Sequence, residues 1–198
     1  MNASATLRDV IGLDNTLPRL GGATLIMIDF QNTYRTGVMA LDGAEPALAA
    51  GARLLAAARA AGTPVVHVVD AGYDISSELG AISPEVAPAE DEPVVVKHVP
   101  NAFHGTDLEK TLRELGAGPG RPDLVLAGFM THMCITFTAQ GAFNLGYRPT
   151  VVAEATATRP LPAPDGSTVP AATLQTGSLT TIADLFGTVA PTVGHLTR

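Results

Sequence analysis

The sequence predicts a three-layer α/β domain in which a mainly parallel six-stranded sheet carries helices on both faces. Short apolar runs alternate along the chain with alanine- and leucine-rich segments of helical composition. The runs at 24–30 and 124–127 are almost continuously apolar, which is typical of strands buried on both faces of a parallel sheet. Because no repeat, low-complexity tract or linker divides the chain, we expect one domain over residues 1–198.

The first half of the chain contains an arm, a helix and three predicted strands. Residues 1–22 end in Pro18 and Gly21-Gly22, so we expect an N-terminal arm that packs on the domain or crosses to a partner subunit. The alanine-rich segment 46–61 has leucines one heptad apart and a glycine directly after it, which favours a helix packed on the sheet. The strands of this half are predicted at 24–30, 64–70 and 94–97.

The second half continues the alternation. Thr106 with Glu109 three residues later predicts a capping box, so a helix is expected to begin there and to end at Gly116. Two more helices are expected at 134–146 and 170–186, and the remaining strands at 124–127, 149–154 and 188–191. The connecting loops that are expected to determine specificity lie at 31–43, 71–93 and 156–168.

The composition argues against several classes of partner. A net charge of −7 and a pI near 5.1 disfavour binding to nucleic acid or to an anionic membrane, because both require a basic surface. No apolar run reaches the roughly 20 residues that span a bilayer, and the N-terminus lacks the features of a secretory signal. One cysteine cannot form an internal disulfide, which fits a reducing compartment, so we expect a cytoplasmic protein.

The only cysteine, Cys134, lies in a setting that suggests a reactive thiol. The apolar run 124–127 leads through a turn at Gly128 into a segment that is expected to become a helix at the cysteine. The positive end of a helix and its free N–H groups favour a thiolate over a thiol. We therefore treat Cys134 as a candidate nucleophile, although a lone buried cysteine is more often a small hydrophobic residue.

Two charged residues stand at the ends of other predicted strands, Asp29 in the run at 24–30 and Lys97 in the strand at 94–97. Ligands of open α/β sheets bind beyond the carboxyl ends of the strands, so both side chains are placed where chemistry occurs. A cysteine that attacks a carbonyl needs a base, a positive charge and donors for the oxyanion, which aspartate, lysine and backbone amides can supply. The residues alone leave a second interpretation open, in which the aspartate is a cap and the lysine points to solvent.

Three motifs occur together and in order: Leu25-Ile-Met-Ile-Asp-Phe-Gln31, then Lys97 followed by Asn101-Ala-Phe-His-Gly-Thr-Asp-Leu108, then Ala127-Gly-Phe-Met-Thr-His-Met-Cys-Ile135. With them, residues 24 to about 155 resemble the isochorismatase-like cysteine hydrolases, which include nicotinamidases, carbamoylsarcosine amidase and ureidoacrylate amidohydrolase. The resemblance implies an isochorismatase-like fold for the predicted domain. It also implies that Asp29, Lys97 and Cys134 form the catalytic triad.

The family's mechanism, placed on these residues, gives each of them a role. Asp29 would take the proton of Cys134, and Lys97 would stabilise the charges on both side chains. The thiolate would attack the carbonyl of a small amide, carbamoyl or ureido compound, and Asp29 would then activate the water that hydrolyses the acyl-enzyme. The family's non-proline cis peptide maps to Phe129–Met130, and the N–H groups of Met130 and Cys134 would form the oxyanion hole.

Five more residues are candidate walls of the substrate pocket because they lie close to the triad in the sequence. The histidine two residues before the cysteine could equally be packed or face solvent, and the phenylalanine one turn after it could be plain core. The candidates are Phe30, Gln31, Tyr34, His132 and Phe137.

Two departures from the family pattern narrow the expected chemistry. Nicotinamidases hold a metal with histidines in the loop after the second strand, whereas this chain reads Val69-Asp-Ala-Gly-Tyr-Asp-Ile-Ser76 there. We therefore expect no metal and no cofactor. Isochorismatases proper cleave a vinyl ether and lack the catalytic cysteine, so Cys134 favours hydrolysis of a C–N bond.

The preferred function is thus a cysteine hydrolase for a small-molecule substrate, and the resemblance also implies a homodimer or homotetramer. Three alternatives remain: a family member without turnover that serves as a binding or scaffold protein, isochorismatase-type hydrolysis of another metabolite, and a redox role of Cys134. The intact triad argues against the first alternative. The lack of a second, resolving cysteine argues against the last.

Overall fold

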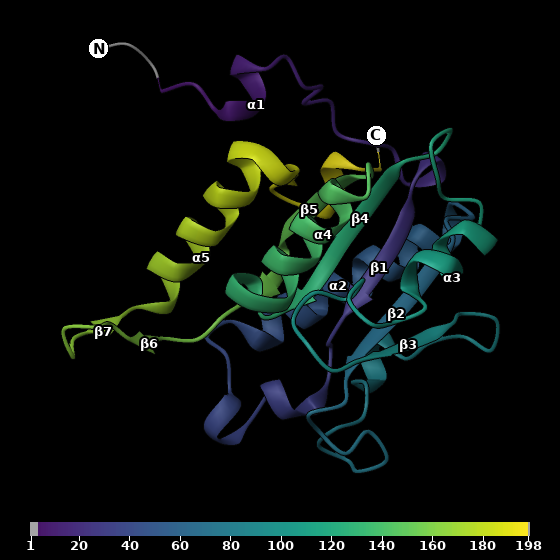
Figure 1. Ribbon diagram of the computed structural model, residues 1–198. Helices are drawn as coiled ribbons and strands as arrows, with labels where there is room; N and C mark the ends of the chain where they lie inside the picture. The colour runs from purple at the N-terminus through teal and green to yellow at the C-terminus, as the bar shows by residue number, and fades with distance from the viewer. Residues whose placement is uncertain (1–3, 198) are drawn as a thin grey trace.

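The computed structural model describes residues 4–197, so the first three residues of the predicted arm and the last residue of the chain lie outside the described part. Within it, six strands form one sheet in the order β3-β2-β1-β4-β5-β8, and every neighbouring pair is parallel (Figure 1). This arrangement confirms the predicted fold class. The strands are β1 (Thr24–Ile28), β2 (Val65–Asp70), β3 (Val94–Lys97), β4 (Asp123–Phe129), β5 (Arg148–Ala157) and β8 (Thr188–Ala190).

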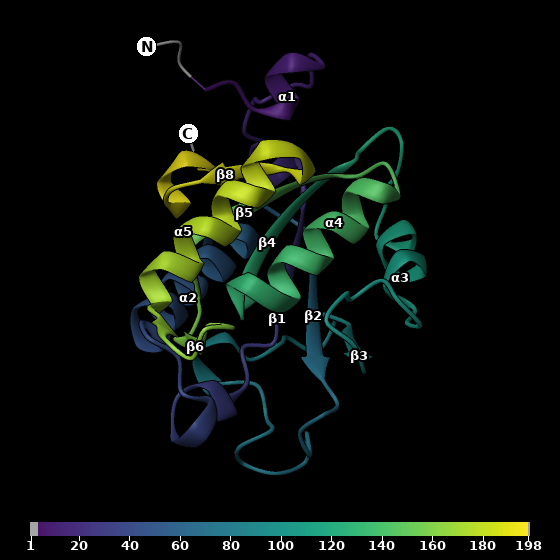
Figure 2. The same cartoon turned by 60° about the vertical axis from the view of Figure 1, so that its left-hand side comes forward.

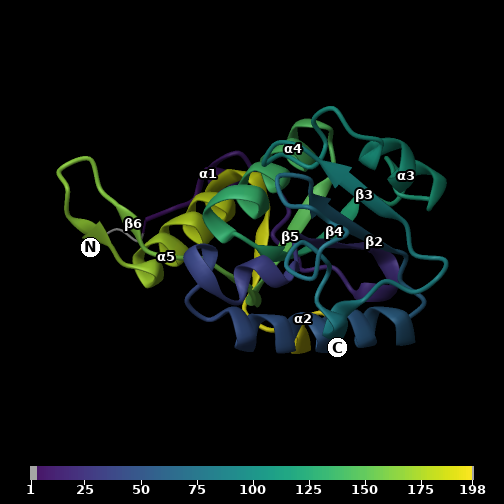
Figure 3. The ribbon, with the colours of Figure 1, turned by 90° about the horizontal axis from the view of Figure 1, so that it is seen from below.

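Helices cover both faces of the sheet (Figures 2 and 3). Side chains alternate along β1, so that Leu25 and Met27 belong to the core on one face while Ile26 and Ile28 belong to the core on the other. Burial on both faces explains why the strand is a continuous apolar run. The first face packs on α2 (Ala44–Ala60), and the second on α3 (Leu108–Glu114), α4 (Thr136–Asn144) and α5 (Ala171–Thr181). No helix in the described part is long and apolar enough to cross a membrane.

The capping box predicted at Thr106 is wrong. Helix α3 begins at Leu108, two residues later than expected. The Thr106 hydroxyl instead donates to the Ala102 carbonyl at 2.6 Å and accepts the Leu108 N–H at 3.2 Å. The preceding loop therefore uses the side chain that the sequence pattern assigns to a cap. The predicted end of this helix is confirmed, because Gly116 follows it with a φ of 86°.

The helix predicted to begin at Cys134 begins earlier. Thr131–Ile135 form a π-helical turn that continues directly into α4, so Cys134 lies inside the first turn instead of at its first residue. π-Helical turns of this kind occur often at functional sites. The cysteine therefore projects from the side of a helical turn that follows β4.

The predicted loop at 156–168 contains regular structure. Strand β5 runs three residues further than expected, and an antiparallel hairpin of β6 (Leu161–Pro162) and β7 (Thr168–Val169) follows it. In Figure 1 this hairpin projects away from the sheet, at the end of α5 from which that helix starts.

The described part of the arm packs on its own domain. It contains α1 (Leu7–Val10), whose first residue donates its N–H to the Asp184 carboxylate at 2.9 Å. The Arg8 guanidinium donates to the Leu185 carbonyl at 3.2 Å. Of the two predicted positions of the arm, the structure shows the one on the same chain.

Candidate active site

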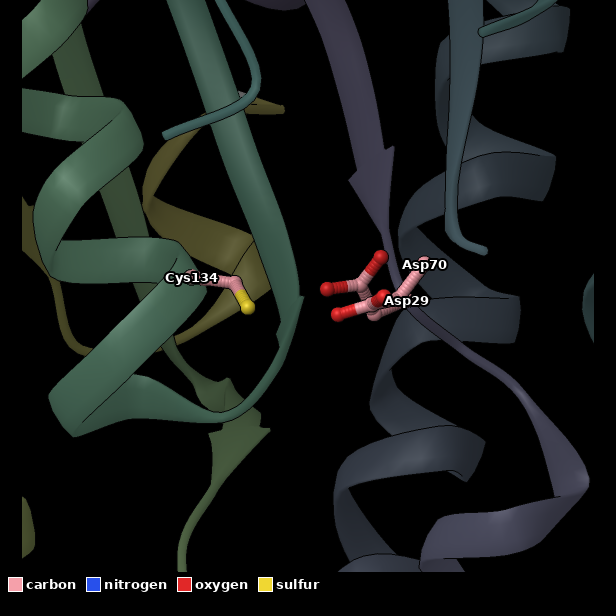
Figure 4. A group of neighbouring side chains, drawn as sticks. All are labelled: Asp29, Asp70 and Cys134. Atoms are coloured by element: carbon pink, nitrogen blue, oxygen red, sulfur yellow. The ribbon is translucent and has the colours of Figure 1, made fainter. Parts of the chain in front are cut away.

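Asp29, Lys97 and Cys134 meet at the carboxyl ends of the central strands. Asp29 follows β1, Lys97 is the last residue of β3, and Cys134 lies on the turn after β4. The Lys97 Nζ is 2.9 Å from Asp29 Oδ2 and 3.3 Å from the Cys134 sulfur. Figure 4 shows the cysteine side chain pointing toward the carboxylates on the neighbouring strands. The structure therefore brings together the three residues that the sequence selects.

The backbone at the end of β1 allows Asp29 to leave the strand. Its φ is 53°, in the left-handed region that side chains other than those of Asn and Asp rarely adopt. Beside it, β4 approaches β1 so closely that a Cβ on Gly128 would lie 1.8 Å from the Ile28 carbonyl oxygen. Only glycine fits at that position, so the close approach of β4 to the end of β1 depends on it. Gly128 therefore lies inside β4, one residue before its end, and not in the turn where the sequence predicts it.

Asp70 is a fourth member of the group, which the sequence reasoning missed. It ends β2 directly opposite Lys97 in the β2–β3 register, and its Oδ2 lies 3.0 Å from the Lys97 Nζ. Its other oxygen accepts the Gly72 N–H at 2.8 Å. The signal was present in the sequence, because an acid at the end of an apolar strand is the same feature that selected Asp29. Lys97 therefore lies between two carboxylates and a thiol.

Asp29 is a buried acid with few partners. Its side chain is fully buried, and among residues 4–197 no donor reaches either carboxylate oxygen with hydrogen-bond geometry, although the Lys97 ammonium lies 2.9 Å away. Burial raises the pKa of Asp29 from 3.8 to about 6, against the opposing effect of the Lys97 charge. This carboxylate binds a proton more readily than an ordinary aspartate does, which suits a general base.

The Cys134 thiol retains its proton in the free protein. Cys134 is 3% exposed, and burial together with the Asp29 charge raises its pKa from 9.0 to about 12, against the charge of Lys97. The thiol pKa is therefore raised, which is opposite to the direction expected from the helix position, because burial and the Asp29 charge disfavour the anion. Burial lowers the pKa of Lys97, but Asp29 and Cys134 outweigh this effect and raise it, so Lys97 stays an ammonium.

Comparison with known proteins places the chain in a family. Residues 23–192 match the model of the isochorismatase domain. The chain is 32% identical to a secreted isochorismatase effector of Verticillium dahliae, over 93% of this chain and 96% of that protein. The chain belongs to the isochorismatase family.

Two further relatives agree with this assignment. The crystal structure of an isochorismatase from Pseudomonas putida is 39% identical and superposes with a TM-score of 0.91, covering 97% of this chain and 99% of that one. The maleamate amidohydrolase of Pseudomonas putida is 34% identical over 66% of this chain and 70% of that protein. This isochorismatase-family protein is a hydrolase.

The donors that might hold a metal ion already surround the Lys97 ammonium. Ligand atoms of Asp29, Asp70 and Cys134 lie within 4.8 Å of one another, which is close enough to share a cation. Yet the Lys97 Nζ is 2.9, 3.0 and 3.3 Å from these three side chains. A metal ion would have to displace this buried ammonium, so the residues fit a lysine-centred site better than a metal centre.

The peptide predicted to be cis is confirmed, since the Phe129–Met130 bond has this configuration. Met130 is buried, and within residues 4–197 its N–H is paired with no backbone acceptor. Its carbonyl accepts the N–H groups of Met133 and Ile135, which begins the turn that holds Cys134. The Met130 N–H thus remains a candidate oxyanion donor of this isochorismatase-family protein.

Phe30, one of the candidate pocket residues, is buried in the core on the α2 face. Its ring faces Gly51 of α2, where a Cβ would lie 2.6 Å from the ring carbon Cζ. The ring also meets Phe129 edge to face, with centroids 4.9 Å apart. Phe30 therefore supports the end of β1 from the α2 face.

Gln31 and Tyr34 are buried close to the acids. The Gln31 amide donates to the Gly80 carbonyl at 2.7 Å and accepts the Asp70 N–H at 2.9 Å, so it positions the end of β2. Tyr34 packs edge to face against Tyr73. Burial raises the pKa of Tyr34, and the nearby Asp29 charge adds to this effect.

His132 and Phe137 lie on the cysteine-bearing segment but in different surroundings. His132 is half-buried, and its Nδ1 is hydrogen-bonded to the Thr158 hydroxyl. Phe137 is 42% exposed, which rules out the plain-core alternative. Neither side chain contacts the three central residues through a hydrogen bond.

A partly open hollow of about 220 Å³ lies at the opposite end of the strands, where β4 and β5 begin. It is lined by residues of the arm and by the amino-terminal ends of β4 and β5, among them Arg8, Asp123, Tyr147 and Arg148. None of the residues around Lys97 contributes to it. This hollow is therefore separate from the candidate active site.

Proposed function

We propose that this protein hydrolyses a C–N bond of a small amide, carbamoyl or ureido substrate through Cys134 and a covalent acyl-enzyme. The observation that carries the proposal is the buried Lys97 ammonium, which contacts the Cys134 sulfur at 3.3 Å and Asp29 at 2.9 Å. An ammonium between a thiol and a carboxylate stabilises either group as an anion, so a proton can pass between them inside the protein. The relative named maleamate amidohydrolase supports amide chemistry.

The first half-reaction forms the acyl-enzyme. The Cys134 sulfur bonds to the substrate carbonyl carbon while its proton passes to Asp29, and the carbonyl oxygen becomes an oxyanion. The N–H groups of Met130 and Cys134 would donate to this oxygen. Protonated Asp29 then gives its proton to the leaving nitrogen as the C–N bond breaks, so ammonia or an amine departs and a thioester remains.

The second half-reaction restores the enzyme. A water molecule gives a proton to Asp29 as its oxygen bonds to the thioester carbon. When the tetrahedral intermediate collapses, the C–S bond breaks and the sulfur of Cys134 recovers a proton from Asp29. Lys97 remains an ammonium in both halves and offsets whichever of its neighbours is anionic.

An ammonia-release screen over simple amides, carbamates and ureides tests the proposal. We expect release by the wild-type protein from at least one of these classes. We expect none above background from a Cys134→Ala protein prepared in parallel. A wild-type protein that releases nothing from all three classes would contradict the proposal and favour a binding protein.

The pH dependence of kcat/KM should follow the ionisation of Asp29. Asp29 must be ionised to accept the thiol proton, and its pKa is raised to about 6. We therefore expect kcat/KM to rise about tenfold per pH unit below pH 6 and to level off above it. If ionisation of the thiol controlled the rate instead, kcat/KM would continue to rise beyond pH 8, because the pKa of Cys134 is raised to about 12. A pH–rate profile from pH 4.5 to 9 separates the two cases.

Asp70 should act as a positioning residue for Lys97. An Asp70→Asn variant keeps the contact with the Gly72 N–H but removes one of the two charges that hold the ammonium. We expect a fall in kcat/KM of about tenfold. The Asp70 charge also raises the pKa of Asp29, so the acid limb of the pH profile should move to lower pH.

The matched control for this variant is Glu78→Gln, which removes a charge from an exposed side chain in the segment after β2. It should leave both the rate and the profile as in the wild type. An Asp70→Asn protein with a lower rate but an unmoved acid limb would contradict the electrostatic role, because a purely structural defect does not change the pKa of Asp29.

A further inference from the structure

Strand β3 forms one edge of the sheet, and one side of this strand is left uncovered. Val94 is 45% exposed and Val96 is 39% exposed, while the two residues that alternate with them are buried. In Figure 1, β3 stands at the outer edge of the sheet, beside β2. The opposite edge strand, β8, contains no exposed residue. Apolar side chains on an open edge mark a surface that can pair with another strand.

The backbone of the same two valines also lacks partners. The Pro93 and Lys97 carbonyls accept N–H groups from β2 and from the residue after it, both at 2.9 Å. In a parallel ladder alternate residues direct their N–H and C=O groups to the same neighbour, so those of Val94 and Val96 point away from β2. Within residues 4–197 no further strand pairs with β3. The edge therefore presents free donors and acceptors together with exposed valines.

The usual protection of an edge strand is missing from β3. Natural proteins commonly place an outward-pointing charge, above all a lysine, on such a strand. The only charged residue of β3 is Lys97, and its side chain is fully buried because it contacts Asp29 and Asp70. The strand thus directs its lysine into the candidate active site and leaves its outer edge apolar.

We propose that β3 pairs with β3 of a second copy of this chain, antiparallel and about a twofold axis, so that the two sheets become continuous. The edge is complementary to itself. With Val95 of the two copies opposite each other, Val94 of each copy lies opposite Val96 of the other, and each N–H of these valines meets a free carbonyl. Opposed residues project from the same face of a sheet, so the exposed valines of both copies pack together across the axis.

The charges beside the strand favour the same register. The segment before β3 is acidic, Glu90-Asp-Glu92, and His98 follows the strand and is exposed. The antiparallel pairing places the acidic segment of each copy opposite His98 of the other, where an imidazole N–H can donate to a carboxylate. A shift of the register by two residues would instead place Glu92 or His98 opposite a valine. Charge and apolar surface therefore match best in the one register that also pairs the free backbone groups.

The molecular mass in solution tests the pairing and does not depend on hydrolysis. We expect sedimentation velocity of the wild type between about 1 and 100 µM to show a monomer–dimer equilibrium. Val96→Lys should weaken the dimer by about 100-fold or more, because it places ammonium groups among the packed valines. His98→Glu should weaken it by about tenfold, because like charges would then face each other beside the strand.

The matched control is Val10→Lys, which adds the same charge to a valine of α1 that is 70% exposed. This variant should form the dimer as the wild type does. A dimer that survives Val96→Lys overturns the inference, and a monomeric Val10→Lys would then assign the contact to the N-terminal arm. A wild type that stays monomeric at about 100 µM also overturns it, and would leave the edge to an extended segment of another protein.

Amide exchange followed by NMR locates the contact. In the dimer, the N–H groups of Val94 and Val96 should exchange as slowly as that of Val95, which points toward β2. In Val96→Lys, the Val94 N–H should exchange about 100-fold faster, while slow exchange at Val95 shows that the strand remains folded. A wild-type dimer in which the Val94 and Val96 N–H groups exchange rapidly would place the interface elsewhere and refute the pairing.

Discussion

Replacement of Cys134 by alanine should lower kcat/KM for any hydrolysed amide by about 10⁴-fold or more, because the atom that bonds to the substrate carbonyl is removed. The fold should survive, since the cysteine lies in the apolar core that packs the helices on the sheet, and the change removes a single heavy atom. Kinetics with the most reactive substrate of the screen measure the loss. A thermal melt of the same preparation shows whether the variant is folded.

Cys134→Ser is the sharper comparison. A hydroxyl can keep the contact with the Lys97 ammonium, yet Asp29, with a pKa of about 6, is too weak a base to take a proton from it. The serine variant should therefore be nearly as inactive as the alanine variant. With a slowly hydrolysed substrate, intact mass spectrometry should show an acyl adduct on the wild type and none on Cys134→Ala. Activity of either variant within tenfold of the wild type would contradict the nucleophilic role.

The strands of this fold could be predicted closely from the sequence, for a physical reason. A parallel strand covered on both faces must be apolar at every position, so the runs that became β1, β2 and β4 are visible without any alignment. The edge strand β3 was also found, because Val94 to Lys97 is bounded by a proline and a charge. The continuous runs identified the strands, and their alternation with helical segments identified the fold class.

The local details could not be predicted, because they depend on tertiary contacts. Thr106 has the spacing of a cap, but the loop before α3 offers the Ala102 carbonyl to its hydroxyl. The β6–β7 hairpin is built from strands of only two residues and contains two prolines, so its segment resembles a loop in composition. The π-helical turn at Cys134 adds one residue per turn to a pattern that otherwise reads as an α-helix.

In the candidate site too, some residues could be predicted from the sequence and others depend on tertiary contacts. Strand ends and the family resemblance indicated Asp29, Lys97 and Cys134. Asp70 also ends an apolar strand and could have been selected in the same way, but its contact with Lys97 is visible only in the register of β2 against β3. The direction of the thiol pKa was wrong because a helix position can be inferred from sequence, while the depth of burial that decides the charge cannot.

Replacement of Lys97 by methionine should destabilise the protein by about 3–5 kcal/mol at neutral pH, because a fully buried carboxylate then loses its countercharge. The same variant should lose most of its activity, since neither the thiolate nor the carboxylate would be stabilised. Methionine has nearly the length of the lysine stem, so the loss reports on charge more than on packing. Urea unfolding at several pH values measures the effect.

The loss of stability in Lys97→Met should depend on pH, because it arises from the ionised form of Asp29. In the wild type, burial already raises the pKa of Asp29 from 3.8 to about 6, and removal of Lys97 takes away the charge that opposes this rise. An acid whose pKa is higher in the folded than in the unfolded state favours folding when protonated, and this contribution is lost as pH rises from the unfolded toward the folded pKa. The gap in stability between wild type and Lys97→Met should therefore be small near pH 4 and widen above pH 6.

The double variant Lys97→Met with Asp29→Asn decides whether Asp29 is the group responsible. It removes the buried acid together with its countercharge, and a neutral pair of similar shape has no charge left to desolvate. The double variant should be more stable than Lys97→Met, although less stable than the wild type. Between pH 6 and 8 its free energy of unfolding should stay constant, whereas that of Lys97→Met should fall with pH. A single variant whose deficit is the same at pH 4.5 and pH 8 would show that Lys97 is held by packing and not by the carboxylate, which would also remove the electrostatic basis of proton transfer from Cys134.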